Sequence, residues 1–197
     1  MPPAPKKNVV ILNGSSLTPE EVRRIVDNRD VTVAVSTDAL KKVKEGHKFL
    51  QNEVGKKVVY GITTGFGPMA SHIIGKGQLD KLQYNLIRSH AVGAGDPVRS
   101  EFVLAAMICR LNTFLKGQSG VSEKLIQQLI VFINKRIIPV VPEHGAVGTS
   151  GDLVQLAHIA LALIGEGEVF YRGRRMSAKK ALQNLKVKPH KLYPKEG

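Results

Sequence analysis

The stretch EHGAVGTSGDLVQLAH, residues 143–158, joins a glycine-rich loop to a strongly apolar helix. The helix is predicted from about Asp152 to Ile164, and the local pattern favours Ser150 or Asp152 as its N-terminal cap. A phosphate cradle at the helix N-terminus is an alternative. The stretch lacks the Gly-Lys-Ser/Thr ending of a P-loop, and the spacing around its serine misses Gly-x-Ser-x-Gly. Neither of those two signatures therefore applies.

The same loop allows a third, chemical interpretation. In a strained turn the Gly151 nitrogen can attack the carbonyl carbon of Thr149. Loss of two waters, one of them from Ser150, then leaves an exocyclic methylidene. Only glycine offers an amide unhindered enough for this approach, because it has no Cβ. The product is an electrophile built from backbone, and it needs no external cofactor.

A second glycine-rich loop, YGITTGFG, spans residues 60–67. It contains the start of a Gly-x-Gly-x-x-Ala match, but no strand–helix–strand unit and no suitably placed acid follow, so we discount a dinucleotide site. The functional alternative is a lid loop in which Gly61, Gly65 and Gly67 are hinges and Tyr60 carries a proton. A lone tyrosine before a glycine is more often structural.

The third candidate is the pair Ser89-His90, on a helix predicted from about Gln78 to Val92. Taken alone, a histidine on a helix is usually a satisfied core or surface residue. Three motifs in this order and spacing are more specific: YGITTGFG at 60–67, QYNLIRSH at 83–90 and the stretch at 143–158. Together they resemble the aromatic amino acid ammonia-lyase family, over a region from about Val31 to Tyr171.

This resemblance implies a mainly α fold with a few short strands. It corresponds to the N-terminal domain of the ammonia-lyase (fumarase/aspartase-like) fold, without the central helical bundle. The resemblance also implies a 4-methylidene-imidazol-5-one (MIO) group formed from Thr149, Ser150 and Gly151, with Tyr60 removing the β-proton of the substrate. The family more often has alanine in place of Thr149, which contributes only a backbone carbonyl. We expect no external cofactor and no metal.

The resemblance places Ser89 and His90 at the positions with which the family recognises the ring of its substrate. The pair resembles that of histidine ammonia-lyases, and some tyrosine-selective relatives carry it too. The implied reaction is elimination of ammonia from an aromatic L-amino acid. The first choice of substrate is histidine, which gives urocanate, and the second is tyrosine, which gives coumarate. Phenylalanine is disfavoured because its ring would leave a polar pair without partners. An aminomutase of the same family is the nearest enzymatic alternative.

Around these motifs, the sequence predicts helices joined by loops and short strands. Thr18 and Glu21 have the spacing of a capping box, and Pro19 suits the first turn of a helix. Ser122 caps a later helix that should bury Leu125, Leu129, Phe132 and Ile133. A helix beginning after Ser36 or Thr37 carries one stripe: Leu40, Val43, His47, Leu50 and Val54. Other predicted elements are strands at 9–12 and 31–35, a helix at 100–115, an extended segment at 138–142 and a hairpin at 169–174.

The composition bounds the class of protein. The chain has 197 residues, 43% of them hydrophobic, which suits a domain with its own core. The single cysteine, Cys109, forms no internal disulfide, so we expect a reducing, cytoplasmic compartment. No segment approaches the roughly 18 apolar residues of a membrane span. The formal net charge is +13, but the basic residues are dispersed as pairs among few aromatics, so we expect neither nucleic acid nor membrane as a partner.

Residues 1–8 are predicted to be a disordered tail, and residues 9–197 a single MIO-bearing domain that stops before the central bundle. Two predicted helices, 102–115 and 153–164, are apolar on more than one face and need further packing partners. The resemblance implies a homotetramer with shared sites for the full-length protein, so we expect the 197-residue chain alone to be inactive. A non-catalytic or complementing fragment and a basic nucleic-acid-binding module are the competing interpretations.

Overall fold

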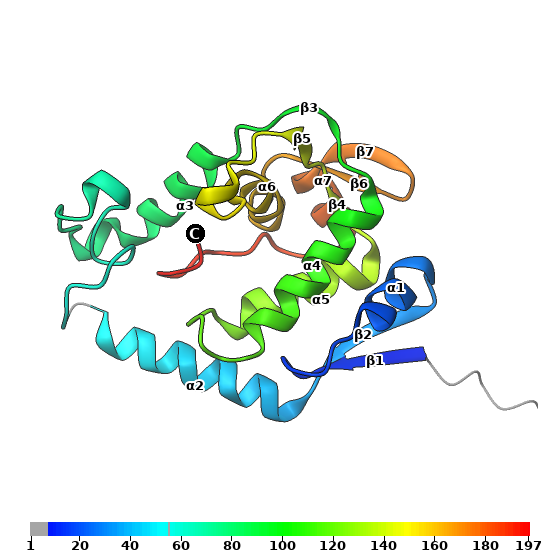
Figure 1. Cartoon of the computed structure of the whole chain (residues 1–197), viewed down its shortest axis with the longest axis horizontal. Coiled ribbons are helices and arrows are strands. Elements are labelled where there is room, and N and C mark those ends of the chain that lie inside the picture. Colours follow the sequence, from blue (N-terminus) through cyan, green and yellow to red (C-terminus); the bar gives the residue numbers. More distant parts are fainter. Residues whose placement is uncertain (1–7, 55) are drawn as a thin grey trace, which may run out of the picture.

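The computed structural model describes residues 8–54 and 56–197 (Figure 1). Its elements are β1 (Asn8–Leu12), α1 (Pro19–Asp27), β2 (Val31–Val35), α2 (Thr37–Glu53), α3 (Leu79–His90), β3 (Ala94–Pro97), α4 (Ser100–Phe114), α5 (Glu123–Lys135), β4 (Ile138–Pro139), β5 (Pro142–His144), α6 (Leu153–Leu163), β6 (Glu168–Tyr171), β7 (Arg174–Ser177) and α7 (Ala178–Asn184). Short 3-10 turns lie at Gly67–Met69, Lys76–Gln78 and Gly148–Ser150. The prediction of a mainly α fold with a few short strands is confirmed.

The N-terminal unit is a strand–helix–strand, in which β1 and β2 pair in parallel with Asn8 opposite Val31. Parallel strands need a crossover connection, and α1 provides it. The Thr18 hydroxyl accepts a hydrogen bond from the Glu21 N–H, and the Glu21 carboxylate accepts one from the Thr18 N–H, so the predicted capping box is present. Asn8 already belongs to β1, which makes the predicted tail one residue too long; the rest of that tail lies outside the described residues.

Asn134, near the end of α5, completes the open edge of β2. Its side-chain amide donates to the Val33 carbonyl at 2.9 Å, and its Oδ1 accepts from the Val33 N–H at 2.8 Å. A buried strand edge must find partners for its backbone groups, and here one side chain supplies both. This contact fixes the N-terminal unit to the helical part of the chain.

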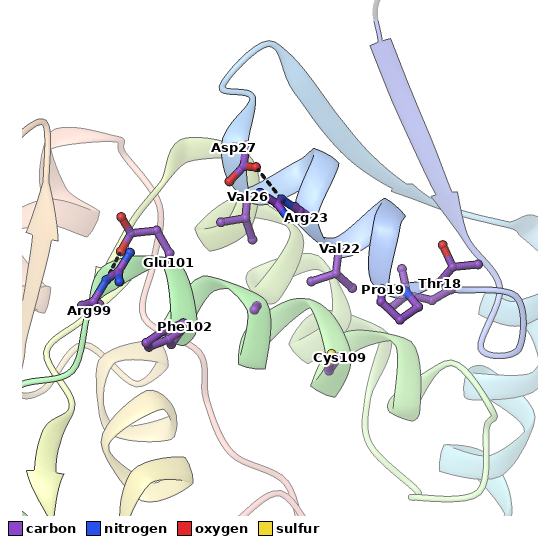
Figure 2. Close-up of a pocket in the computed structure, with 12 residues that line it drawn as sticks. Thr18, Pro19, Val22, Arg23, Val26, Asp27, Arg99, Glu101, Phe102 and Cys109 are labelled. Atoms are coloured by element: carbon purple, nitrogen blue, oxygen red, sulfur yellow. Dashed lines mark hydrogen bonds and ion pairs between the residues drawn. The ribbon is translucent and has the colours of Figure 1, made fainter.

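A groove of about 720 Å³ separates α1 from α4 (Figure 2). Its walls are mostly apolar, with Val22 and Val26 on one side and Phe102 on the other, and Cys109 lies farther along α4. Phe102 is 59% exposed, and Leu153 at the start of α6 is 43% exposed. Both helices that were predicted to be apolar on more than one face thus keep exposed apolar side chains.

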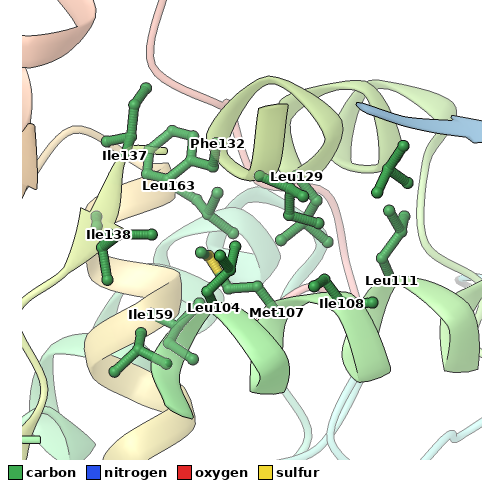
Figure 3. Close-up of a cluster of buried hydrophobic side chains, with 14 of the residues drawn as sticks. Leu104, Met107, Ile108, Leu111, Leu129, Phe132, Ile137, Ile138, Ile159 and Leu163 are labelled. Atoms are coloured by element: carbon green, nitrogen blue, oxygen red, sulfur yellow. The ribbon is translucent and has the colours of Figure 1, made fainter. Parts of the chain in front are cut away.

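The main core lies between α4, α5 and α6 (Figure 3). Its central side chains are buried and come from these helices, from β4 and from the residue just before β4: Leu104, Met107, Ile108, Leu111, Leu129, Phe132, Ile137, Ile138, Ile159 and Leu163. The four side chains that the sequence places inside α5 are all buried. Complete burial of such a side chain stabilises a fold by roughly 1.5–3 kcal/mol. This core holds α6 and the loop before it in place.

The stripe predicted on α2 is only partly buried. Val43 is 1% exposed, whereas the other four residues of the stripe are half-buried. Figure 1 shows α2 along the outer edge of the molecule, where one side of the helix meets the rest of the chain. At Gly46 the backbone of α2 touches the backbone of Gly117 so closely that a Cβ on Gly46 would lie 2.0 Å from the Gly117 oxygen.

Candidate functional site

A strand pairing and a hydrogen bond from backbone to side chain bring the second and third sequence motifs together. β3, which follows the Ser89-His90 pair, runs antiparallel to β5 with Ala94 opposite His144. The Gly93 N–H donates to Nε2 of His158 on α6 at 3.1 Å. Burial lowers the pKa of His158, which favours the neutral ring that can accept this bond. The end of α3 is thereby attached to both sides of the loop at 145–152.

An ion pair holds α3 to the turn after α6. Arg88 donates from Nε and Nη2 to the two carboxylate oxygens of Glu166, at 3.0 and 2.6 Å. The hydrogen bond from Arg88 lowers the pKa of Glu166, and the hydrogen bond to Glu166 raises the pKa of Arg88. Because such a bidentate ion pair has a fixed geometry, it orients the end of α3 that carries Ser89 and His90.

A cavity of about 810 Å³ lies where α3, α5 and α6 meet. The loop at 60–67 contributes Tyr60 and Phe66, α3 contributes His90, and α6 contributes Leu153 and Leu156. Two candidates that lie 30 positions apart in the sequence therefore line one cavity. The remaining lining is largely apolar, as is usual where a cavity binds the ring of a small molecule.

The loop that carries Tyr60 is tightly packed. The Tyr60 oxygen accepts a hydrogen bond from the Gly67 N–H at 3.0 Å, and its ring meets Phe66 edge-on at 5.8 Å. A Cβ on Gly61 would lie 2.6 Å from the Phe66 ring, and one on Gly65 would lie 2.6 Å from the Met69 Cβ. These two glycines are required for close packing. Their predicted role as hinges stays a prediction.

His90 and Ser89 share one backbone acceptor. His90 Nδ1 lies 2.8 Å from the Leu86 carbonyl, and the Ser89 hydroxyl donates to the same oxygen at 3.0 Å. A carbonyl only accepts, so the His90 hydrogen is on Nδ1 and Nε2 keeps a lone pair in the neutral ring. Ser89 is exposed and is not part of the cavity lining, whereas His90 is half-buried within it.

The residues at 149–151 form an exposed turn just before α6. The Ser150 hydroxyl donates to the Val147 carbonyl at 2.7 Å, and the Gly151 N–H donates to the Gly148 carbonyl at 3.2 Å. Asp152 has a left-handed backbone and makes no side-chain cap. The prediction that Ser150 or Asp152 caps α6 is therefore wrong: the Ser150 hydroxyl bonds within the turn, and the left-handed backbone of Asp152 is not the extended conformation of a normal N-cap. The turn does not line the cavity, but Leu153, two residues after Gly151, does.

Sequence reasoning missed the wall of the cavity formed by residues 190–197. The side chain of Glu196 is fully buried, and it accepts hydrogen bonds from His190 Nε2 at 2.8 Å, from the Ser122 N–H at 2.7 Å and from the Tyr193 N–H at 2.8 Å. Nearby, Gln83 of α3 accepts from two backbone N–H groups of the same segment. The one local signal was a histidine and a glutamate six residues apart in a proline-bearing segment.

These contacts predict an acid-sensitive contribution to stability. Burial raises the pKa of Glu196, but the hydrogen bonds from His190, Ser122 and Tyr193 outweigh it and hold the pKa below the ordinary value of 4.5. A carboxylate with a depressed pKa in the folded state stabilises the fold above its unfolded-state pKa, and this stabilisation is lost as pH falls through the folded-state value. Glu196→Gln should therefore cost about 2 kcal/mol at neutral pH.

The check is the free energy of unfolding in urea as a function of pH. The difference between the wild type and Glu196→Gln should be largest near neutral pH and should shrink progressively below pH 4.5. Glu101→Gln is the matched control, because Glu101 is an exposed carboxylate in an exposed ion pair. A difference that does not change with pH would contradict the expectation.

The other features of the described residues supply no competing site. The groove between α1 and α4 has ion pairs only at its rim, Arg23 with Asp27 and Arg99 with Glu101 (Figure 2). Within residues 8–54 and 56–197, no group of three or more His, Cys, Asp or Glu side chains is placed to hold a metal ion. Over the same residues, no helix has the length and apolar character needed to cross a membrane.

The fold and the three assembled motifs define a class of protein. A family profile described as "Aromatic amino acid lyase" matches residues 17–197. The chain belongs to this family.

Particular relatives refine the comparison. The chain is 48% identical over 189 residues to a histidine ammonia-lyase of Macrococcus caseolyticus, an alignment that covers 95% of this chain and 38% of the relative. It superposes on ergothionase from Treponema denticola, an ergothioneine-degrading enzyme, with a TM-score of 0.91 at 34% identity, covering 96% of this chain and 38% of that one. A tyrosine aminomutase from Streptomyces globisporus gives a TM-score of 0.86 at 34% identity, with coverages of 95% and 35%. The chain thus spans little more than a third of the length of the relatives it matches.

Proposed function

We propose that this chain provides the MIO-forming part of a carbon–nitrogen lyase that eliminates ammonia from an aromatic L-amino acid, with histidine as the first substrate. The observation that carries the proposal is the cavity that Tyr60 and His90 both line, next to the start of α6. The turn at 149–151 lies directly before that helix. The high identity to a histidine ammonia-lyase supports the choice of reaction.

The residues at 149–151 fit an internally formed MIO group. Gly151 has φ +88°, a left-handed conformation natural to glycine, and no atom lies within 4 Å of the position a Cβ would take. Thr149, Ser150 and Gly151 are all exposed, so there is room for an added methylidene. We infer that these three residues would form the group, which supplies an electrophile that helps the amine of the substrate to leave as ammonia.

The chain's own side chains would bind the substrate and move its proton. His90 Nε2 is the acceptor for the N–H of an imidazole ring or the O–H of a phenol, because its Nδ1 hydrogen is engaged by Leu86. The Tyr60 oxygen takes the proton that leaves the β-carbon of the substrate. Apolar side chains such as Leu153 and Leu156 would exclude water around the ring.

The Nε2 acceptor of His90 suits both an imidazole ring and a phenol, so it does not distinguish histidine from tyrosine. The sequence comparison favours histidine. The similarity to a tyrosine aminomutase supports the alternative in which ammonia returns to the β-carbon. The two reactions differ in their product: an unsaturated acid for the lyase and a β-amino acid for the mutase. Analysis of the product by mass spectrometry separates them.

We further propose that the full-length protein is a cytoplasmic homotetramer and that the 197-residue chain alone is inactive. The coverage of 38% of a histidine ammonia-lyase supports the expected inactivity of the chain alone. The exposed apolar side chains Phe102, Val147 and Leu153 support packing against further protein. Urocanate or coumarate formed by the purified 197-residue chain would contradict this.

The decisive test is the intact mass of the protein. We expect a deficit of two water molecules, located by peptide mapping at residues 149–151, in protein purified from its native source or from a host expressing it. Ser150→Ala should abolish the deficit completely, because the methylidene carbon comes from the Ser150 side chain. Ser89→Ala is the control and should keep the deficit. A wild-type protein of full mass would overturn the catalytic proposal.

A further inference from the structure

The positive charge of the chain is concentrated in one structural unit. Residues 169–188 contain seven Lys and Arg and no Asp or Glu, whereas residues 8–168 contain 18 Lys and Arg against 15 Asp and Glu. The basic pairs are dispersed along the sequence, but the acids that would balance them are missing from this segment. The segment comprises most of the β6–β7 hairpin and α7, and we call it the basic unit.

The fold directs these cations into solvent. α7 packs through Ala178, Ala181 and Leu182, which are buried, so its lysines lie on the outer side. All seven cations of the basic unit are exposed: Arg172, Arg174, Arg175, Lys179, Lys180, Lys186 and Lys188. Figure 1 shows the hairpin at the periphery of the molecule, with β7 as its outer strand.

Few of these charges are neutralised. Arg175 pairs with Glu168 at 2.5 Å, and no other cation of the basic unit has an acid within 4.0 Å among the described residues. Arg172, in the left-handed turn before Gly173, lies over the Tyr171 ring at 5.3 Å. Concentrated like charges cost free energy in the isolated molecule, and a polyanion relieves that cost.

Further cations directly precede β4, the strand that pairs with the hairpin. β4 pairs antiparallel with β6, with Ile138 opposite Phe170, so the chain before Ile138 runs toward the hairpin turn. That chain carries Lys135, which is exposed, and Arg136. The Arg136 guanidinium donates to the Ile25 and Asn28 carbonyls, so Lys135 is the exposed cation that this part of the chain adds.

The side chains around the seven cations indicate which kind of polyanion the basic unit would bind. Within residues 169–188, all of which the structure describes, no large hydrophobic side chain is exposed, so nothing is available to insert into a lipid bilayer. Tyr171 is buried and Phe170 half-buried, so the unit presents no aromatic platform for stacking the bases of a single strand. Regularly spaced phosphates on a duplex need only Lys and Arg.

The dispersed basic pairs of the sequence predict no nucleic-acid partner, but the fold exposes seven cations in one unit. Against that expectation, we propose that the basic unit is a binding surface for duplex nucleic acid, which it contacts through phosphates without reading the base sequence. The proposal does not depend on the lyase function, because it uses none of the residues assigned to that reaction. It accounts for a charge that the elimination of ammonia leaves unexplained.

The test is fluorescence anisotropy of a labelled 20-base-pair duplex with the purified chain, between about 50 and 200 mM salt. The variant is Arg174→Gln/Lys179→Gln/Lys180→Gln. The matched control is Lys41→Gln/Lys48→Gln/Lys81→Gln, which removes the same charge from exposed positions on α2 and α3. Vesicles rich in phosphatidylserine and an unlabelled single strand are tested in parallel.

We expect the variant in the basic unit to weaken duplex binding about tenfold or more, and to reduce the slope of log K against log salt by about 3. The control should change binding less than about threefold, because any loss there reflects net charge alone. Equal losses in both variants, no binding at the lowest salt, or a preference for vesicles or for the single strand would each overturn the proposal.

Discussion

Replacing Gly46 with alanine is expected to destabilise the chain by about 3 kcal/mol, at the upper end of the usual cost of overpacking. The added Cβ would lie 2.0 Å from the Gly117 oxygen and 3.1 Å from the Gly117 carbonyl carbon. Both atoms belong to the backbone, so no side chain can rotate away. Either α2 must move outward or the loop after α4 must shift.

The sign of this effect is informative, because helix propensity alone predicts the opposite. Gly46 is in the middle of α2, where an exchange of glycine for alanine normally stabilises a helix by about 1 kcal/mol. The urea midpoint should therefore fall for Gly46→Ala with an unchanged slope. Gly77→Ala is the control, since nothing lies within 4 Å of that Cβ position. An unchanged or raised midpoint for Gly46→Ala would disprove the close approach.

Predictions from the sequence succeeded where the determining contacts are local. The capping box at Thr18 and Glu21 and the cap of α5 by Ser122 are both present, because each depends on residues three positions apart. The boundaries of α4 and α6 agree with prediction to within one residue. Apolar spacing correctly identified the buried side of α5.

Sequence patterns did not predict the elements whose conformation depends on partners far away in the chain. β3 has the sequence AGDP, which lacks the residues that favour strands, and it is extended because it pairs with β5. α7 is a short helix whose buried face is mainly alanine, so its apolar pattern is weak. The parallel pairing of β1 with β2 depends on the crossover geometry of α1, which alternation of residues does not reveal.

The same distinction applies to the candidate site. Family motifs located Tyr60 and His90, and the structure places both at one cavity. Glu196 lies in no motif, and Gln83 begins one in which only Ser89 and His90 were given a role. Glu196 binds Ser122, 74 positions away, and Gln83 binds backbone groups 112–114 positions away. Their importance follows only from burial and from backbone groups that they satisfy. The cap expected from Ser150 is absent because α6 begins at Leu153, after Asp152, and the Ser150 hydroxyl instead donates to the Val147 carbonyl within the turn.

Removal of the Tyr60 hydroxyl is the second change with a large expected effect. Tyr60→Phe keeps the ring that packs edge-on against Phe66 but loses the oxygen that accepts from the Gly67 N–H. If this oxygen takes the β-proton, kcat should fall by about 10²–10⁴-fold, the usual contribution of a positioned acid or base. KM should change by a small factor, because His90 and the apolar walls that we propose as the binding site for the ring are untouched.

The measurement needs a complete enzyme, and a chimera provides it: residues 1–197 joined to the remaining part of the histidine ammonia-lyase from Macrococcus caseolyticus, which is 48% identical over the shared region. Urocanate formation is then followed for the chimera, for Tyr60→Phe and for Tyr84→Phe. Tyr84 is the matched control, because its hydroxyl also accepts from a backbone N–H, that of Leu192 at 3.2 Å, and has no assigned part in proton transfer. A similar loss of kcat in both variants would assign Tyr60 a structural role. A large loss in Tyr60→Phe alone would identify its oxygen as the group that moves the proton, since the two variants remove the same atom from the same kind of ring.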